Sequence, residues 1–411
     1  MAVDKDLFLY DLAIVAILKN EGRYLKEWLD YHLLAGVEHF YLYDNDSTDN
    51  QAEVVKPYVA AGLVDYISAP GKAMQMQAYN DAVADYRFQS RYIAFIDGDE
   101  FIYPKTNRPI VEVVDEILLR DPNAAGLAIH WQLYGSNRQV TADYSKGVLE
   151  RFTRRAEKNF WEEHEVKNNM IQAIGNGFLK VIVNPRRVKQ VHTHYAIYFD
   201  DYHSVNESGL KLSPNPASRA IVEEKIAINH YFTKSREEFD LKRSRGRAYS
   251  GSKWSDKYFD VYDRNEVFDN GILKYRAARA ENFSLESDKQ RFNRVTDALI
   301  KTLSLYADEK ISDLETALTC RALSHYLKEK VFEEASLAAI LKSLDGIKIS
   351  DVRLLLSELP KLLNLPYPIV EDLRGALIQI ISQTMDFLRE KKLFNEMLDL
   401  SYLRRLLKAW R

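Results

Sequence analysis

The chain has 411 residues, of which 46% are hydrophobic, 12% aromatic and 28% charged, and this composition excludes collagen-like and low-complexity proteins. The length predicts two or three domains, and a net charge of −3 argues against a nucleic acid as the partner. Because Cys320 is the only cysteine, intramolecular disulfides and cysteine-based metal sites are excluded, and a reducing, cytoplasmic compartment is expected.

The first hundred residues alternate strand-like and helix-like segments. The predicted strands are 12–18, 39–43, 63–67 and 91–96, the first of them a continuous apolar run that indicates burial on both faces. The predicted helices cover 23–35, then Ser47 or Thr48 to Gly62, and 72–86, with Gly36 ending the first. Strands joined by helices of this length are typical of right-handed βαβ units. We therefore predict an α/β fold with a mainly parallel sheet.

The pattern changes further along the chain. Residues 125–228 form shorter segments, with strands predicted at 126–131 and 178–183. From about 288 the apolar spacing is helical, which predicts an α/β domain at 1–287 and an all-α domain at 288–411.

The last residues, 400–411, combine an apolar stripe with four cations. No apolar run is long enough to span a bilayer, so the chain is expected to be soluble or peripheral to a membrane. The segment 400–411 predicts either a peripheral contact with the inner face of a membrane or packing on the preceding helices.

Two acidic clusters directly follow predicted strands. They are Asp44 to Asp49 after the second strand and Asp97-Gly-Asp99-Glu100 after the fourth. In open α/β sheets the ligand lies beyond the carboxyl ends of the strands, and paired carboxylates suit a hard divalent cation. The alternative is a solvated turn. The sequence lacks the glycine-rich dinucleotide fingerprint, the P-loop and the serine nucleophile elbow, which disfavours those classes.

These clusters belong to a longer series of motifs. The series is Lys19-Asn20-Glu21, Glu27-Trp28, Tyr43-Asp44-Asn45, Gln75, Tyr79-Asn80-Asp81, Asp97 to Phe101, Trp131, Tyr134-Gly135-Ser136, Lys180, Pro185, Val191-His192 and Ile228 to Lys242. In this order the motifs resemble glycosyltransferase family 92 and the related family 2-like bacterial glycosyltransferases. The resemblance implies a GT-A fold, Mn²⁺ or Mg²⁺ at an Asp-X-Asp site, a UDP-sugar donor of a hexose such as galactose, and inversion at the anomeric carbon.

The resemblance also implies roles for individual residues. Donor binding falls to Asn20, Glu21, Asp44, Gln75, Asp97, Lys234 and Lys242, and metal binding to Asp97, Asp99 and His230. For Asp44 the alternative is a helix cap, and for the two lysines it is a charged surface helix. His192 and His194 compete with His230 for the metal, whereas His32 falls on the apolar face of its helix and is predicted to be core.

Acceptor-side residues are harder to identify from the sequence. An inverting transfer needs a carboxylate base, and Glu163 and Glu165 are the candidates because they lie beside aromatic residues. Trp131 and Trp161 are candidate platforms for an oligosaccharide or lipid-linked glycan acceptor of the kind found in cell-surface polysaccharide synthesis. An exposed acidic loop and a buried core tryptophan are the alternatives. Two other functions stay open: a sugar-nucleotide nucleotidylyltransferase and a non-catalytic carbohydrate-binding or scaffold protein.

Overall fold

The computed structural model describes residues 10–87, 89–166, 170–245 and 254–280. The predicted helical domain at 288–411 and its terminal segment 400–411 lie outside the described residues. The chain divides into two compact units, one made of residues 11–83 and 92–285, the other of residues 1–10, 84–91 and 286–411. In the described ranges, no helix has both the length and the apolar character needed to cross a membrane.

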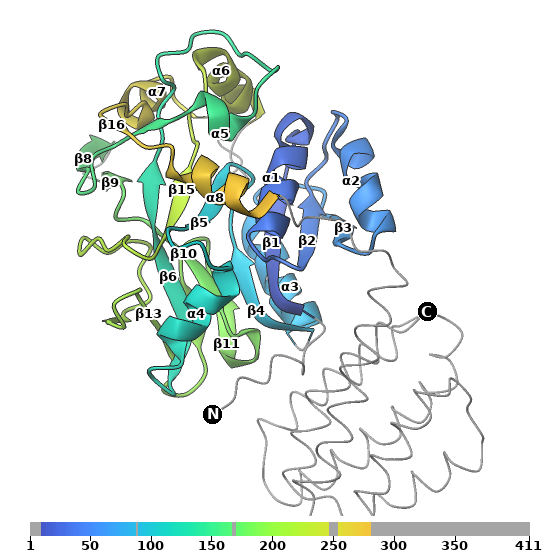
Figure 1. Cartoon of the computed structure of the whole chain (residues 1–411), viewed down its shortest axis with the longest axis vertical. Helices are drawn as coiled ribbons and strands as arrows, with labels where there is room; N and C mark the ends of the chain where they lie inside the picture. The colour runs from blue at the N-terminus through green and yellow to red at the C-terminus, as the bar shows by residue number, and fades with distance from the viewer. Residues whose placement is uncertain (1–9, 88, 167–169, 246–253, 281–411) are drawn as a thin grey trace, which may run out of the picture. The chain divides into compact units, whose positions relative to one another are not determined.

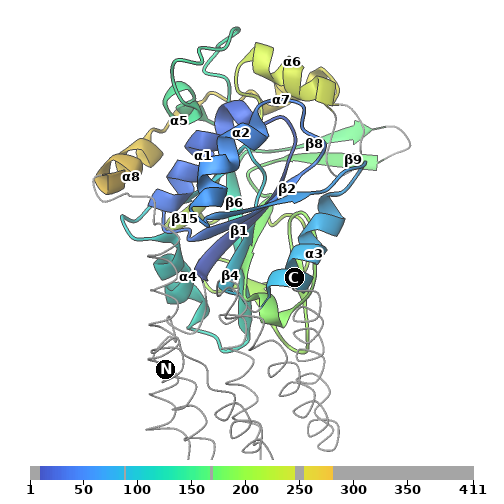
Figure 2. The same ribbon diagram turned by 90° about the vertical axis from the view of Figure 1, so that its right-hand side faces the viewer.

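The N-terminal half is a run of βαβ units. Its elements are β1 (Tyr10–Leu18), α1 (Gly22–Leu34), β2 (His39–Asp44), α2 (Gln51–Ala60), β3 (Val64–Ser68), α3 (Gln75–Tyr86) and β4 (Ser90–Phe95). β2 is parallel to both β1 and β3, which confirms the predicted parallel order. α1 and α2 cover one face of the sheet and α3 the other, as Figure 2 shows, because the chain turns back after β3 to place β4 beyond β1.

The second half is more irregular. Its strands are β5 (Glu100–Pro104), β6 (Ala124–Leu133), β7 (Arg154–Arg155), β8 (Trp161–Val166), β9 (Met170–Gly175), β10 (Leu179–Val183), β11 (Val188–Val191), β12 (Ala196–Tyr198), β13 (His203–Val205), β14 (Lys211–Leu212), β15 (Ile226–His230) and β16 (Val267–Phe268). Its helices are α4 (Ile110–Leu118), α5 (Val148–Arg151), the 3₁₀ turn η2 (Pro185–Arg187), α6 (Arg236–Arg245), α7 (Lys257–Tyr262) and α8 (Gly271–Ala280).

One mixed sheet organises both halves (Figure 1). Its order is β14-β13-β6-β10-β4-β1-β2-β3, with β15 pairing both β5 and β6. β10 runs antiparallel to both its neighbours, β4 and β6, so the parallel arrangement does not extend through the second half. The fold is α/β as predicted, and the strands predicted at 126–131 and 178–183 are confirmed as β6 and β10.

The observed ends of α1 and α2 agree with the sequence-based prediction, but the start of α2 does not. Gly36 and Gly62 follow α1 and α2 with φ of +96° and +67°, the left-handed conformation in which glycine ends helices. The predicted cap at Ser47 or Thr48 is wrong, because α2 begins at Gln51 after Asn50. Both side chains face the β1–α1 connection instead, where Ser47 Oγ accepts a hydrogen bond from the backbone N–H of Asn20 at 3.0 Å.

The core beside the acidic turn is built around helix α1. His32 is fully buried, as predicted, and its Nδ1–H donates to the carbonyl of Trp28 at 2.8 Å. Its Nε2 accepts from the backbone N–H of Ile102 at 3.2 Å, while the Trp28 indole N–H donates to the carbonyl of Glu100 at 2.8 Å. Burial lowers the pKa of His32 to about 3, which keeps it neutral. Helix α1 thereby fixes β5 directly after the Asp97–Glu100 turn.

Candidate active site

A cavity of about 540 Å³ opens where β1 and β4 end. The residues around it come from strand ends, from the turn after β11, and from α6 and α7. They are Ile17, Leu18, Lys19, Glu21, Asn45, Gly71, Lys72, Ala73, Gln75, Asp97, Gly98, Asp99, Trp131, His192, Thr193, His194, His230, Phe232, Lys242, Arg245, Trp254 and Tyr262. Seven of the predicted site residues are among them: Glu21, Gln75, Asp97, Asp99, Trp131, His230 and Lys242. We refer to this space as the donor cavity, after the donor-binding residues that the sequence predicts and that line it, Glu21, Gln75, Asp97 and Lys242.

Asp97 is the first carboxylate of the turn between β4 and β5. It accepts hydrogen bonds from Lys180 Nζ at 2.9 Å, from Gln75 Nε2 at 2.7 Å and from the hydroxyl of Tyr79 at 3.2 Å. Burial alone would raise the pKa of Asp97, but the ammonium of Lys180 holds it below its ordinary value. Asp97 is therefore ionised and fixed in orientation by groups from α3 and β10.

Asp99, two residues on, points to a different set of partners. Lys242 of α6 donates to its carboxylate and, at 3.1 Å, to the carbonyl of Phe232. His230 at the end of β15 places Nε2 3.6 Å from Asp99 Oδ1. Burial alone would raise the pKa of Asp99, but Lys242 and His230 hold it well below its usual range. The second carboxylate is therefore also ionised.

The donor chemistry of this cluster fits a divalent cation. Carboxylate oxygen with imidazole nitrogen suits Mn²⁺, and carboxylates suit Mg²⁺. A ligating histidine usually donates its second N–H to a carboxylate, and here His230 Nδ1 and Glu100 Oε1 are 4.0 Å apart, both buried and both without a hydrogen-bond partner. Within the described residues no three acidic or histidine side chains form a metal-binding group. Asp99 and His230 are a fitting pair, because Asp99 Oδ1 and His230 Nε2 lie 3.6 Å apart. Each carboxylate also pairs with a lysine, Asp97 with Lys180 and Asp99 with Lys242, and Asp97 as a further ligand stays a prediction.

Cations outnumber anions around the donor cavity. Lys19, Lys72, Lys242 and Arg245 line it together with Glu21, Asp97 and Asp99. Arg245 pairs with Glu21 at 2.8 Å and donates to the carbonyl of Asn20 at 2.7 Å, which fixes the end of α6 over the β1–α1 connection. A site with this balance favours an anionic ligand, and a bound cation would increase that preference.

Three predicted donor-binding residues do not line the cavity. Asn20 Oδ1 accepts from the backbone N–H of Thr48 at 2.7 Å, and Asp44 Oδ1 accepts from Gln51 Nε2 at 3.1 Å. Both side chains thus connect the loops after β1 and β2. Lys234 is buried with its Nζ 4.3 Å from the ring centre of Tyr24. Their roles in donor binding stay predictions.

The predicted acceptor-side residues also differ in whether they line the donor cavity. Trp131 lines the cavity although it is only 6% exposed, and its ring lies 4.3 Å from that of His230. Trp161 and Glu163 on β8 do not line it, and Trp161 Nε1 donates to Glu163 Oε1 at 3.0 Å. Glu165 is on the same strand. The general-base role of both glutamates stays a prediction.

Lys180 belongs to one of the motifs named above, but the sequence assigns it no role in the site. It is 1% exposed and lies 2.9 Å from Asp97 and 3.3 Å from Glu100. Burial raises the pKa of Glu100 to about 8, so this carboxyl is largely protonated at neutral pH, and Lys180 balances Asp97. The available signal is a lysine inside an otherwise apolar strand, Leu179 to Val183, because such a lysine needs a buried anion.

Comparison with known proteins agrees with the motifs. Residues 16–264, more than half of the chain, match the family model described as Glycosyltransferase family 92. A glycosyltransferase family 92 protein of Ricinus communis is 28% identical over 127 residues, which is 31% of this chain and 23% of that protein. A galactan β-1,4-galactosyltransferase of Arabidopsis thaliana is 31% identical over 100 residues, 22% of this chain and 19% of that protein. The matched parts span about a fifth of the length of these relatives.

Solved structures show more distant likeness. S. aureus TarS 1-349 in complex with UDP is 12% identical, with a TM-score of 0.27, over 98% of this chain and 91% of that chain. Glucosyl-3-phosphoglycerate synthase from Mycobacterium tuberculosis, solved with Mn²⁺, UDP and glucosyl-3-phosphoglycerate, is 18% identical, with a TM-score of 0.23, over 30% of this chain and 44% of that chain. TM-scores of this size support no inference about this chain.

Proposed function

The chain belongs to glycosyltransferase family 92, and from this premise we propose that it transfers a hexose from a UDP-sugar to a glycan hydroxyl in the donor cavity. The observation that carries the proposal is the ionised Asp97-Gly-Asp99 turn at the carboxyl end of β4, which faces His230 in a cavity whose wall also holds four cations. An oligosaccharide or a lipid-linked glycan serves as acceptor, and the GT-A arrangement is proposed for the sheet.

The reaction follows from the chemistry of a sugar nucleotide. The acceptor oxygen forms a bond to the anomeric carbon while the bond from that carbon to the β-phosphate oxygen breaks. The acceptor proton passes to a base, UDP leaves, and attack from the opposite face inverts the configuration. The barrier falls when negative charge on the departing diphosphate is neutralised by groups already in place. Lys242 and Arg245 lie at the cavity wall, where they pair with Asp99 and Glu21, and their positive charge would also act on a diphosphate bound there.

We further propose that Mn²⁺ or Mg²⁺ is held at Asp99 and His230, with Asp97 directed toward the donor by Lys180 and Gln75. The cation would supply positive charge to the diphosphate. Galactose is the proposed sugar, because the matched Arabidopsis protein is a galactosyltransferase.

Calorimetry with UDP tests both parts of this proposal. UDP is expected to bind the natural chain with Mn²⁺ present, and Asp99→Asn is expected to weaken that binding at least tenfold in protein that thermal unfolding shows to be folded. Asp65→Asn is the matched control, since Asp65 is half exposed on β3 and outside the cavity. If UDP does not bind, or binds the Asp99 variant equally well, the site assignment is wrong. Equal affinity in EDTA would contradict the cation alone. Release of galactose or transfer from UDP-galactose then tests the sugar.

A further inference from the structure

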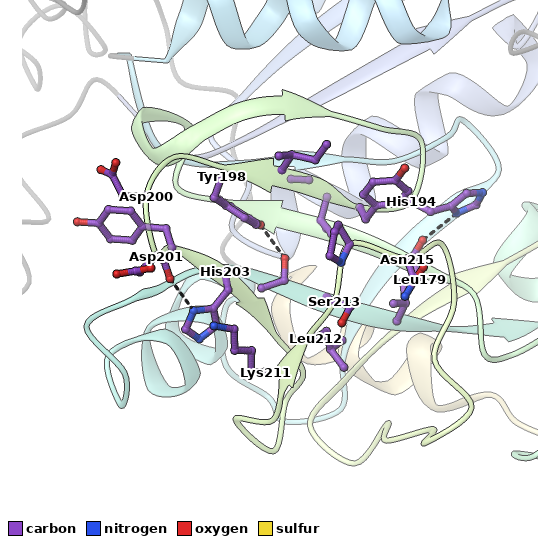
Figure 3. Close-up of a pocket in the computed structure, with 18 residues that line it drawn as sticks. Leu179, His194, Tyr198, Asp200, Asp201, His203, Lys211, Leu212, Ser213 and Asn215 are labelled. Carbon is purple, nitrogen blue, oxygen red and sulfur yellow. Dashed lines mark hydrogen bonds between the residues drawn. The ribbon is translucent and has the colours of Figure 1, made fainter. Parts of the chain in front are cut away.

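A second cavity, of about 590 Å³, lies against the sheet beside the donor cavity. Ala128 of β6 and Leu179 and Val181 of β10 contribute apolar side chains to it, and residues between 194 and 215 provide the rest of its wall (Figure 3). This volume is within the range of small-ligand sites. We refer to it as the tyrosine cavity, after Tyr195, Tyr198 and Tyr202.

The charge of the tyrosine cavity is opposite to that of the donor cavity. Asp200, Asp201 and Lys211 are its charged residues, with His203 beside them. The carboxylates of Asp200 and Asp201 are exposed and make no hydrogen bond or ion pair with any other described residue. Two free carboxylates against one ammonium disfavour a phosphate or a second nucleotide. A neutral ligand with hydroxyl groups can satisfy them.

The rest of the wall suits a saccharide. Tyrosine rings offer flat apolar faces to the C–H groups of a sugar ring, while their hydroxyls form hydrogen bonds. The Tyr198 hydroxyl lies 2.7 Å from that of Ser204, and Ser213 and Asn215 add polar groups on the opposite side (Figure 3). An apolar floor with hydroxyl and amide groups around it matches the alternation of C–H and O–H groups on a neutral sugar.

The turn after β11 is the partition between the two cavities. His192 and Thr193 line the donor cavity, Tyr195 lines the tyrosine cavity, and His194 lines both. The turn is held by a hydrogen bond from the His192 N–H to the Tyr195 carbonyl at 2.7 Å and by stacking of their rings at 4.6 Å. A ligand longer than one sugar could therefore reach from one cavity to the other past a single side chain.

The orientation of His194 is fixed by β10. Its Nδ1–H donates to the carbonyl of Leu179 at 2.9 Å, as Figure 3 shows. Burial lowers the pKa of His194 to about 3, so the ring is neutral and Nε2 can only accept a hydrogen bond. Nε2 has no partner among the described residues. It is an acceptor suited to a hydroxyl that lies between the cavities.

We propose that the tyrosine cavity binds the inner sugar units of a neutral acceptor glycan, whose terminal unit passes His194 into the donor cavity. This inference rests on the proposed function, since the terminal unit is the one that would be glycosylated. It requires an acceptor of at least two sugars. A charged glycan, or a monosaccharide, fits the two cavities less well.

The test is calorimetry of the full chain with defined neutral oligosaccharides. The probes are β-1,4-linked galactose oligomers and α-1,4-linked glucose oligomers of one to five units, with sialyllactose as the anionic probe. At least one neutral oligomer of two or more units is expected to bind at least tenfold more tightly than its monosaccharide and than sialyllactose. UDP is titrated in parallel.

Variants then locate the bound oligomer. Asp201→Lys and Tyr195→Ala are expected to weaken oligomer binding at least tenfold and UDP binding less than twofold. Tyr144→Ala, at a tyrosine that is 42% exposed outside both cavities, is the matched control. If the Tyr195 variant does not fold, the exposed Asp201 decides alone.

The binding results distinguish failure of the acceptor site from failure of the proposed function. Absence of oligomer binding, equal binding by the Asp201 variant, or preference for sialyllactose overturns the tyrosine cavity as an acceptor site. If UDP still binds with Mn²⁺ in those cases, the proposed function stands, and loss of UDP binding to the natural chain overturns both.

Discussion

His32 and His230 are both buried histidines, but the surrounding groups satisfy only one of them. His32 uses both ring nitrogens within the core, on Trp28 and Ile102. His230 has Nδ1 without a partner and Nε2 facing Asp99 across 3.6 Å. A histidine with unused hydrogen-bonding capacity at a cavity wall is more informative than one that is merely buried.

The two histidines should therefore respond differently to substitution. His230→Ala is expected to weaken Mn²⁺-dependent UDP binding at least tenfold and to leave Tm nearly unchanged. His32→Ala is expected to lower stability by about 2–4 kcal/mol, because it removes two buried hydrogen bonds and leaves a cavity. UDP affinity of its folded fraction should be retained. Calorimetry and thermal unfolding of both variants check this, and equal losses of UDP affinity would return His230 to a structural role.

Glu238 makes the buried ion pair that fixes the start of α6. Its two carboxylate oxygens accept from Arg151 at 2.7 and 2.9 Å, and both side chains are 3% exposed or less. Burial would raise the pKa of Glu238, but hydrogen bonds from Arg151 and Ser235 lower it to about 2. Since the folded pKa lies below the unfolded value, this pair stabilises the fold above the unfolded pKa and loses that contribution as the pH falls toward 2.

The pH dependence of stability should show this contribution. Between pH 6 and pH 3 the Tm of the natural chain is expected to fall more steeply than that of Glu238→Gln, which has no carboxyl to protonate. At pH 6 the variant should be less stable by about 3 kcal/mol, and more than half of the difference should vanish by pH 3. Glu237→Gln, one residue away, is the control. Parallel curves for the natural chain and Glu238→Gln would contradict the assignment.

At the scale of elements, the connections after β1 and β2 are joined to each other by hydrogen bonds that run in both directions. Asn20 adopts a left-handed backbone with φ of +54°, and its Oδ1 accepts from the N–H groups of Thr48 at 2.7 Å and Asp49 at 3.3 Å. In return, Gly22 N–H donates to Asp49 Oδ2 at 2.9 Å. These bonds place Glu21, and through it Arg245, at the donor cavity.

Two substitutions separate the contributions at Asn20. Asn20→Ala loses the side-chain bonds and keeps an unfavourable backbone conformation, whereas Asn20→Gly loses only the bonds. We expect Asn20→Gly to be more stable than Asn20→Ala by about 1 kcal/mol, with both below the natural chain. Thermal unfolding measures this order. Equal stability of the two variants would show that the left-handed backbone is not what makes Asn20 suitable there.

The same hydrogen bonds between the two connections explain why the start of α2 could not be predicted from the sequence. The strands β1 to β4, β6 and β10 and the Asp97–Asp99 turn were predictable, because apolar runs and the acidic residues directly after them are local patterns. The cap of α2 was not, since Ser47 and Thr48 are ordinary cap residues whose hydrogen bonds depend on a loop 27 and 28 residues away. A local pattern cannot register a competing partner that only the tertiary fold brings near.

At the scale of the whole molecule, the site combines segments that are far apart in the chain. Lys180 reaches Asp97 across 83 residues and Lys242 reaches Asp99 across 143. Their pairing depends on β10 and α6 reaching the end of β4, and neither placement follows from residue spacing. His194 likewise reaches both cavities only because the turn after β11 folds against β10. The sequence thus predicted Asp97, Asp99 and Lys242 as site residues, but neither the part played by Lys180 nor which lysine pairs with which carboxylate.

The position of β10 also determines how the chain can fold as it is made. β10 lies between β4 and β6, yet both of those strands are synthesised before Leu179 emerges. Until then β4 has a free edge where β10 will pair, and open strand edges favour aggregation. The first hundred residues, regular as they are, cannot complete their sheet during the first part of synthesis.

Ribosome-bound chains of increasing length would reveal this delay. Protease resistance of β1 to β4 is expected to rise only in chains long enough for Val183 to have left the ribosome, and full resistance in chains that stop before Leu179 would contradict it. Proline substitution at Val181, which lies opposite Phe95, should keep even long chains sensitive. For this protein, we expect a strand near the middle of the sequence to set the moment at which the nascent sheet loses its open edge at β4.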